Sequence, residues 1–403
     1  MVKPQSGRIF RRFSLLLVPG LLALGLVSCI AENQKVATQF PVGKVSEAKI
    51  SKVLDTTLSS VFNTEVVPAL ETTTSQALYK TIPNASVVKL AQTSNNKTPG
   101  IKTNVIRIGF QQSGDLVKVT GVLEKRLTPL GIKVEWAQFA QGPQLMEAMN
   151  VGRVDLGSVG ETPPIFAQAA GSQLVYVVGS RRTANSGKGS AIAVPPDSPI
   201  RSVKDLKGQT VVFQKASASH YFILRALEQA GLKYSDIKVH SIPNVDAASA
   251  FLEGKIPVWV TGDPHLARAE KLKKVRVIKT AEGLDSPGGY YIGIKKFALD
   301  NPRLLRIVIE EIDKVQRWAQ ANPKEYGKLI QQYQKLPPDV TNLVLSRRSY
   351  GLRGITPSLI KEQQRVADYF YENGLLPKRL NIKEATLTPQ QYAEITPPTI
   401  PQN

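Results

Sequence analysis

From position 105 onward, short apolar runs alternate with amphipathic stretches along the chain. Short apolar or alternating runs predict strands, and apolar positions repeated about every 3.6 residues predict helices. The first block of this region predicts strands at 105–110, 132–136, 154–156 and 174–178, and helices at 116–130, 145–150 and 165–170. Strands that alternate with helices predict an α/β fold with a largely parallel sheet.

A second block with the same order follows Ser190. It predicts strands at 191–194, 210–213 and 237–240 and a helix at about 219–230, and from Pro302 the pattern is helical, at 304–321 and 360–373. A chain of 403 residues is long enough for one large core or for two lobes.

One unit of sequence occurs once in each block. A helix, a glycine (Gly152 or Gly254), a strand and a glycine-acid pair follow one another, and the pair is Gly160-Glu161 in the first copy and Gly262-Asp263 in the second. The pair stands at the carboxyl end of a strand, which is where open α/β sheets bind ligands. We therefore expect both pairs to lie near a binding cleft.

Three segments place the start of a helix directly after a strand. They are 111–115 (which begins at Gln111), 158–164 (Ser158 to Pro164) and 214–220, in which Ser217 or Ser219 can cap the helix. Helix N-termini carry unpaired N–H groups and a partial positive charge, so together the three would suit an oxyanion such as a sulfonate. Capping of the helix alone is the other explanation for each segment.

The N-terminus has the pattern of an export signal. Four basic residues precede an apolar run at 13–27, and this run ends in Leu26-Val27-Ser28-Cys29. The run is too short for a convincing membrane span. It resembles a bacterial lipoprotein signal, so we expect residues 1–28 to be removed and Cys29 to carry lipid. The alternatives are a plain secretory signal and, from Arg11-Arg12, a twin-arginine signal.

Residues 29–103 are rich in polar residues and proline, with weak periodicity. This composition predicts a flexible tether between the lipid and the folded part of the chain. A small additional domain is the alternative.

Charge and composition restrict the chemistry. The formal net charge is +20, but the basic residues are scattered and exported lipoproteins rarely meet nucleic acid, so we expect small anions or anionic headgroups rather than nucleic acid as partners. Cys29 is the one cysteine, and three histidines are present. Once Cys29 is acylated, no thiol nucleophile or cysteine metal site is left, and we expect neither a metal nor a cofactor.

A set of short motifs between Val105 and Lys383 resembles one protein family. The motifs include Gly109-Phe110-Gln111, Gly142-Pro143-Gln144, the run 151–158, the run 163–171, Phe213-Gln214-Lys215, Ser219-His220, Asp263-Pro264 and the run 371–378. They resemble the aliphatic-sulfonate-binding proteins of bacterial ABC importers. Binders of taurine and nitrate share the architecture, so the motifs are more specific for the superfamily than for the ligand.

The resemblance implies a two-lobed type II periplasmic binding protein fold with a hinge and a central cleft. Lobe 1 would comprise 104–187 and 283–383, lobe 2 would comprise 188–282, and 384–403 would form a C-terminal tail. The function implied is that of a substrate-binding lipoprotein, periplasmic or at the cell surface, which captures an alkanesulfonate for sulfur uptake and delivers it to an ABC permease and its ATPase. We expect a monomer held at the membrane by its lipid.

The resemblance also suggests which residues bind the ligand. Gln111, Ser158 and the amide of Gly160 would line the cleft from lobe 1, and the residues facing them from lobe 2 would be Ser217, Ser219, His220 and Asp263. A carboxylate beside a sulfonate is repulsive, so Asp263 could instead cap a helix, pair with Arg181 or Arg268, or bind the amine of a taurine-like ligand. Glu161 raises the same question.

The sequence departs from the family at three positions. Gly262 stands where tryptophan is common, and Ala216 and Ala218 stand where glycine and serine are usual. The glycine predicts room for a larger tail unless Trp259 or Tyr290 fills the space. Taurine, nitrate and a larger sulfonate or sulfate ester are the alternative ligands. A desulfinase-like enzyme is a distant alternative. Such enzymes use a cysteine nucleophile, and no free thiol is left in this chain once Cys29 is acylated.

Overall fold

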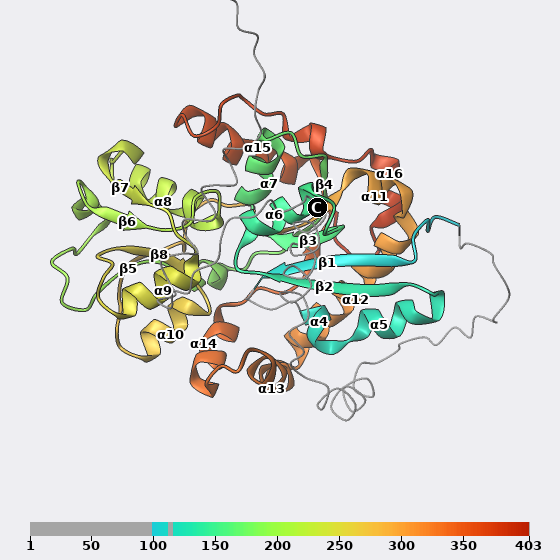
Figure 1. Ribbon diagram of the computed structural model, residues 1–403, viewed down its shortest axis with the longest axis horizontal. Coiled ribbons are helices and arrows are strands. Elements are labelled where there is room, and N and C mark those ends of the chain that lie inside the picture. The colour runs from blue at the N-terminus through green and yellow to red at the C-terminus, as the bar shows by residue number, and fades with distance from the viewer. Residues whose placement is uncertain (1–98, 112–115, 403) are drawn as a thin grey trace, which may run out of the picture. The chain divides into compact units, whose positions relative to one another are not determined.

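The computed structural model describes residues 99–111 and 116–402, in which two β-sheets carry the architecture (Figure 1). The first sheet has the strand order β11-β4-β10-β3-β1-β2, with β1 Val105–Gln111, β2 Lys133–Phe139, β3 Leu156–Val159, β4 Leu174–Ser180, β10 Tyr290–Ile294 and β11 Leu352–Arg353. The second sheet has the order β7-β6-β8-β5-β9, with β5 Ser190–Val194, β6 Thr210–Val212, β7 Lys238–His240, β8 Trp259–Gly262 and β9 Arg276–Thr280.

Both sheets are mixed rather than largely parallel. β1 runs parallel to β2 and β3, and β6 runs parallel to β7 and β8, as strands joined by helical crossovers do. β10 is antiparallel to β3 and β4, and β5 is antiparallel to β8 and β9. β5 and β10 are the strands with which the chain enters one sheet after leaving the other, so no crossover within a sheet fixes their direction. The prediction of a largely parallel sheet therefore holds for β1 to β3 and for β6 to β8, and it fails for the pairs that β5 and β10 make.

Two connections carry the chain between the sheets. The first runs from the end of β4 at Ser180 to the start of β5 at Ser190, and the second runs from Thr280 at the end of β9 to Tyr290 in β10. The predicted lobe divisions, at 187/188 and 282/283, fall inside these connections. All the described residues belong to one compact unit of the chain.

Helices cover both faces of the first sheet (Figure 1). One apolar cluster joins the sheet to α4 Leu116–Thr120, α5 Val122–Leu127, α11 Lys295–Asp300, α12 Pro302–Ala321, α13 Pro323–Gln334 and α16 Pro389–Ile395. A second cluster joins the sheet to α6 Gly142–Asn150, α7 Thr162–Ala169 and α15 Pro357–Glu372. The predicted C-terminal tail thus includes a helix, α16, whose Ile395 is buried in the first of these clusters.

The second sheet is covered by α8 Ala218–Gln229 on one face and by α9 Asn244–Leu252 and α10 His265–Lys271 on the other. α14 Pro338–Arg347 follows α13 and precedes β11 of the first sheet, yet its Val340 and Val344 pack against Ala267 of α10. Short 3-10 turns complete the described part: η2 Thr128–Leu130, η3 Ala184–Gly189, η4 Val203–Leu206, η5 Tyr234–Asp236 and η6 Ile382–Ala385.

The repeated unit of the sequence folds in the same way in both copies. Gly152 after α6 and Gly254 after α9 have φ values of 72° and 75°, in the left-handed region that favours glycine. The next N–H bonds back across the helix end in both copies, Arg153 to the Ala148 carbonyl and Lys255 to the Ala250 carbonyl, each at 2.9 Å. This glycine-terminated helix end turns the chain into β3 in one copy and toward β8 in the other.

The predicted helix at 116–130 is interrupted. Gly121, with φ at 63°, separates α4 from α5, and η2 completes the segment before Gly131 ends it with φ at 72°. Cys29, the signal and the tether lie outside the described residues. Within the part that the structure describes, no helix has the length and hydropathy needed to cross a bilayer.

Candidate functional site

A pocket of ≈ 180 Å³, here called the polar pocket, is lined by residues at or just after the ends of strands from both sheets. Gln111, at the end of β1, and Gly160, which follows β3, line it from the first sheet. Gly262 and Asp263, at the end of β8, line it from the second sheet. Its remaining lining residues are Ala140, Gln141, Gly142, Pro163, Ser190, Ser217, Ala218, Ser219, Asn244, Pro264 and His265. The two glycine-acid pairs of the repeat therefore both reach this pocket or its border.

Five of the described helices begin at the polar pocket. The first residues of α6, α8, α9 and α10 line it, namely Gly142, Ala218, Asn244 and His265, and α7 contributes Pro163 from its first turn. The first N–H groups of a helix have no partner inside the helix, and they carry a partial positive charge. An anion in the polar pocket would face several such groups at once.

The side chain of Gln111 is bonded to the backbone of Ser158. Gln111 donates a hydrogen bond from Nε2 to the carbonyl oxygen of Ser158, at 3.0 Å. This bond fixes the Gln111 amide at the pocket wall, whereas Ser158 is not among the residues that line the polar pocket. Ser217 precedes α8 and donates its hydroxyl to the Gln214 carbonyl at 2.7 Å, and Ser219 stands in the first turn of the helix.

His220 lies among aromatic rings and not on the wall of either pocket described here. The ring is 1% exposed, and its centroid lies 5.1 to 5.9 Å from those of four neighbours, Phe166, Phe213, Tyr234 and Phe370. Its Nδ1 accepts a hydrogen bond from the Ala216 N–H at 3.2 Å. Burial, with a smaller effect of the Lys215 charge, lowers the pKa of His220 to about 3, so the ring is neutral. It packs α8 and braces the loop before it.

Asp263 caps α10 and makes an ion pair. Its Oδ1 accepts a hydrogen bond from the Ala267 N–H at 3.0 Å and lies 3.4 Å from Nη1 of Arg347. The structure thus bears out the capping alternative, and the ion-pair partner is Arg347 rather than Arg181 or Arg268. Burial raises the pKa of Asp263 to about 6, although the Arg347 charge opposes this. Arg347 also holds Glu270, with Nη2 2.7 Å from Oε2.

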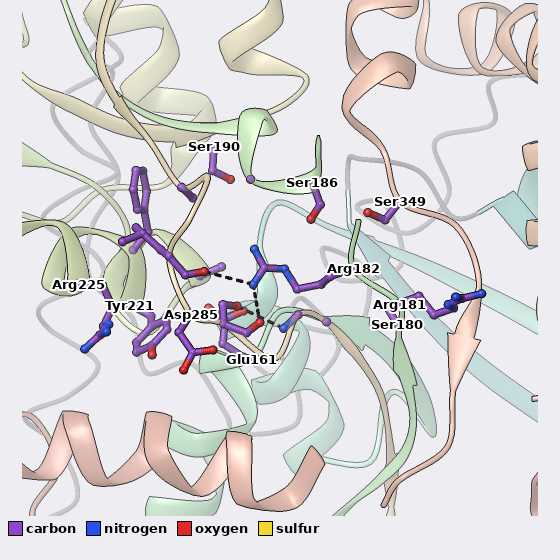
Figure 2. Close-up of a pocket in the computed structure, with 18 residues that line it drawn as sticks. Glu161, Ser180, Arg181, Arg182, Ser186, Ser190, Tyr221, Arg225, Asp285 and Ser349 are labelled. Carbon is purple, nitrogen blue, oxygen red and sulfur yellow. Dashed lines mark hydrogen bonds between the residues drawn. The ribbon is translucent and has the colours of Figure 1, made fainter. Parts of the chain in front are cut away.

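Glu161 faces a second cavity, of ≈ 270 Å³, shown in Figure 2. Its backbone carbonyl accepts a hydrogen bond from Nε2 of Gln363 at 2.6 Å, and its Oε1 accepts one from the Thr162 hydroxyl at 3.4 Å. The residue is 6% exposed. Burial raises the pKa of Glu161 to about 7, against the lowering effects of a backbone hydrogen bond, the Arg182 charge and Thr162.

The space beside Gly262 is not filled by the two candidate aromatic residues. Trp259 is fully buried, stacks near Phe251 and donates from Nε1 to Asn244 at 3.0 Å. Tyr290 packs against Tyr176 with ring centroids 4.8 Å apart. Neither ring is among the residues that line the polar pocket.

Comparison with known proteins gives the site its context. An aliphatic sulfonates-binding protein of Escherichia coli (strain K12) is 37% identical over 290 residues, which are 71% of this chain and 89% of that protein. The chain belongs to the family of aliphatic sulfonate-binding proteins. This confirms the resemblance seen in the motifs. The family described as NMT1/THI5 like also matches, over residues 129–326.

Two solved structures of the family share the fold. The alkanesulfonate-binding protein SsuA of Xanthomonas axonopodis pv. citri, bound to MOPS, superposes with a TM-score of 0.68 at 33% identity, covering 71% of this chain and 98% of that one. The periplasmic aliphatic sulphonate-binding protein SsuA of Escherichia coli gives 0.64 at 36% identity, with 72% and 99% covered. The two-lobed binding-protein fold is thereby confirmed. Both relatives are sulfonate-binding proteins, and the Escherichia coli protein is periplasmic. As a member of their family, this chain is a solute-binding protein.

Four residues at the site were not predicted from the sequence. Asn244 and Gln141 line the polar pocket, and Arg347 and Arg182 border the two carboxylates. The Pro243-Asn244 step before an amphipathic run was a usable signal for a helix start. Nothing local marks Arg347, because it comes from α14, far along the chain from Asp263.

Proposed function

We propose that the polar pocket binds the sulfonate group of an aliphatic sulfonate, and that the chain delivers this ligand to the permease and ATPase of an ABC importer. The observation that carries the proposal is the arrangement of five described helices that begin at one small polar pocket. Membership of the sulfonate-binding family supports the choice of a sulfonate over other oxyanions.

The pocket offers donors that suit the three oxygens of a sulfonate. The first residues of α6, α8 and α9 line the pocket, and the first turns of these helices carry unpaired N–H groups and the positive ends of the helix dipoles. Asn244 accepts hydrogen bonds at Oδ1 from Trp259 and from Thr261, each at 3.0 Å, so its Nδ2 amide is oriented to donate elsewhere. Gln111 and Ser219 add neutral side-chain donors. Hydrogen bonds to an anion are stronger than those between neutral groups.

Ligand binding would also bring the two halves of the site together. Gln111 and Gly160 belong to the first sheet, and Ser219, Asn244 and Gly262 belong to the second. An anion held by both sets favours their approach, and the connections between β4 and β5 and between β9 and β10 are the segments that would act as the hinge. A permease would then recognise the closed form.

We also propose that Cys29 anchors the chain by lipid to a membrane, as a monomer. The support comes from the sequence, in which Leu26-Val27-Ser28-Cys29 ends the apolar run of an export signal. An anchored receptor stays near the permease that it serves.

Calorimetry with ethanesulfonate and butanesulfonate tests the site through Ser219. A carboxylate in the first turn of α8 is favourable for the helix but repels an anion in the pocket. We expect Ser219→Asp to weaken sulfonate binding by at least about 100-fold, and the neutral isostere Ser219→Asn to change it by less than about 10-fold. Equal affinities of the wild type and Ser219→Asp would show that the sulfonate binds elsewhere.

A further inference from the structure

The second cavity adjoins the polar pocket. Ser190 and Ala218 line both spaces, and the consecutive residues Gly160 and Glu161 line one each, Gly160 the polar pocket and Glu161 the second cavity. At ≈ 270 Å³ the second cavity is larger than the polar pocket, at ≈ 180 Å³. A tail that extends from an anionic group at the helix starts would have to pass Ala218 and Ser190 to enter the second cavity.

The inner wall of this cavity combines apolar groups with a carboxylate (Figure 2). Tyr221, Phe222 and Leu284 line the cavity and are only 6%, 5% and 6% exposed, so all three side chains are buried. Glu161, equally buried, forms no ion pair with any residue that the structure describes, and its carboxylate receives the long Thr162 bond. Aromatic faces beside an anionic group are the surroundings that favour an alkylammonium ion.

Two of the three arginines that line the cavity, Arg182 and Arg225, are bonded to other groups. Arg182 donates from Nη1 to the carbonyl oxygens of Leu284 and Ser286. Arg225 pairs with Glu228 and lies over the ring of Tyr369, at 5.1 Å. Neither Arg182 nor Arg225 therefore makes a direct contact with the Glu161 carboxylate that would neutralise its charge.

We propose that the second cavity holds the tail of the bound sulfonate and that Glu161 there selects tails carrying a cationic amine. This inference rests on the proposed function of the polar pocket. The ligand class is that of zwitterionic sulfonates, in which an alkylated ammonium is separated from the sulfur by a short alkyl chain. The arrangement also explains how a carboxylate can stand next to an anion site, because Glu161 lines a different space from Gly160.

The selectivity should depend on pH through the ionisation of Glu161. Burial raises the pKa of this carboxyl to about 7, so it is mostly ionised at pH 8 and mostly protonated at pH 5.5. The charged and titratable groups that act on it or share its cavity are Arg181, Arg182, Tyr221, Arg225, Asp285 and Tyr290. Burial raises the pKa values of Tyr221 and Tyr290, so both remain neutral over this range.

Two probes of nearly the same shape test the proposal by calorimetry. They are 3-(trimethylammonio)propane-1-sulfonate, which has a permanent positive charge on its tail, and 3-(trimethylsilyl)propane-1-sulfonate, whose tail is neutral. At pH 8 we expect the wild type to bind the ammonium probe at least about tenfold more tightly than the silyl probe. At pH 5.5 this ratio should fall toward one.

Variants assign the preference to Glu161. Glu161→Gln keeps the size and the acceptor oxygen, and should reduce the ratio at pH 8 to about one while changing the affinity for the silyl probe by less than about threefold. Asp285→Asn is the matched control, because Asp285 is an exposed carboxylate of the same cavity that pairs with Arg365. It should leave the ratio close to that of the wild type.

Each other outcome has a distinct meaning. If ethanesulfonate binds but both larger probes fail, the second cavity is not a tail site. Equal affinities for the two probes, or a ratio that survives Glu161→Gln, would overturn the role of Glu161. If no sulfonate binds at all, the proposed function of the polar pocket fails, and the inference about its tail fails with it.

Discussion

Arg347 and Asp263, 84 positions apart in the chain, form an ion pair at the edge of the polar pocket, with Nη1 3.4 Å from Oδ1. Asp263 follows β8 of the second sheet, and Arg347 ends α14, a helix that leads into β11 of the first sheet. The two side chains are 15% and 12% exposed, so water screens their attraction only partly. The pair therefore connects α14, which leads into the first sheet, to the end of β8 in the second sheet, beside the polar pocket.

A double-mutant cycle measures this link. We expect Arg347→Met and Asp263→Asn, singly and together, to show a coupling of about 1–3 kcal/mol in the free energy of unfolding by urea, because loss of Arg347 leaves the largely buried Asp263 carboxylate unpaired, whereas after loss of Asp263 the guanidinium keeps Glu270. Asn at position 263 keeps an acceptor for the Ala267 N–H, so the cap of α10 is conserved. Additive effects of the two substitutions would mean that the pair contributes little.

Glu161→Gln should change how stability depends on pH. Because the pKa of Glu161 is raised from 4.5 to about 7, the folded protein binds this proton more tightly than the unfolded chain, and wild-type stability should fall as pH rises through that window. The free energy of unfolding of the variant, relative to the wild type, should be higher at pH 8 than at pH 5 by about 1–3 kcal/mol. Urea titrations at both pH values measure it, with Asp285→Asn as the control. If the stability difference between variant and wild type is the same at both pH values, ionisation of Glu161 does not destabilise the folded protein.

Ala216→Gly should stabilise the protein. Ala216 has φ at 59°, in the left-handed region that glycine adopts more readily than alanine. We expect a gain of up to about 1 kcal/mol in the free energy of unfolding. Ala218→Gly is the matched control, because Ala218 is the first residue of α8 and glycine there should be neutral or destabilising. Equal changes for the two variants would contradict the argument from backbone strain.

Gly262→Trp should restrict the size of the ligand. Neither Trp259 nor Tyr290 lines the polar pocket beside Gly262, so an indole at this position would enter space that the wild type leaves open. We expect the affinity for bulky sulfonates to fall by about 1–3 kcal/mol, as for overpacking, while ethanesulfonate is spared.

The control for this prediction is Gly262→Ala, which places the same Cβ 3.3 Å from the Gly189 carbonyl oxygen without the indole. A thermal-shift series of sulfonates of increasing size compares the three proteins. If the tryptophan variant ranks the ligands as the wild type does, the volume next to Gly262 does not set the size limit.

Cys29→Ser should abolish attachment to the membrane. The chain has one cysteine, so the variant has no other thiol for acylation in the predicted lipoprotein signal. Metabolic labelling with a fatty-acid analogue should mark the wild type and not the variant, which should be soluble or remain unprocessed. Label retained by the variant would exclude Cys29 as the lipid site.

The sequence by itself determined most of the helices, most of the strands and the repeated unit. Local periodicity decides whether a segment is helix or strand, and glycines such as Gly152 and Gly254 end helices by a backbone conformation that they adopt without strain. Those effects act within a few residues, so they can be read before any tertiary contact is known. The family motifs likewise placed Gln111, Gly160, Ser217, Ser219 and Asp263, and all five line the polar pocket.

Only the tertiary structure decided where each side chain points and which distant groups it meets. His220 turns into an aromatic cluster, and Gly160 and Glu161 line different spaces although they are neighbours in sequence. Arg347 reaches Asp263 from another helix, and β5 and β10 run antiparallel because the chain changes sheets before them. These features depend on packing between segments far apart in the chain, and local sequence patterns carry no information about such distances.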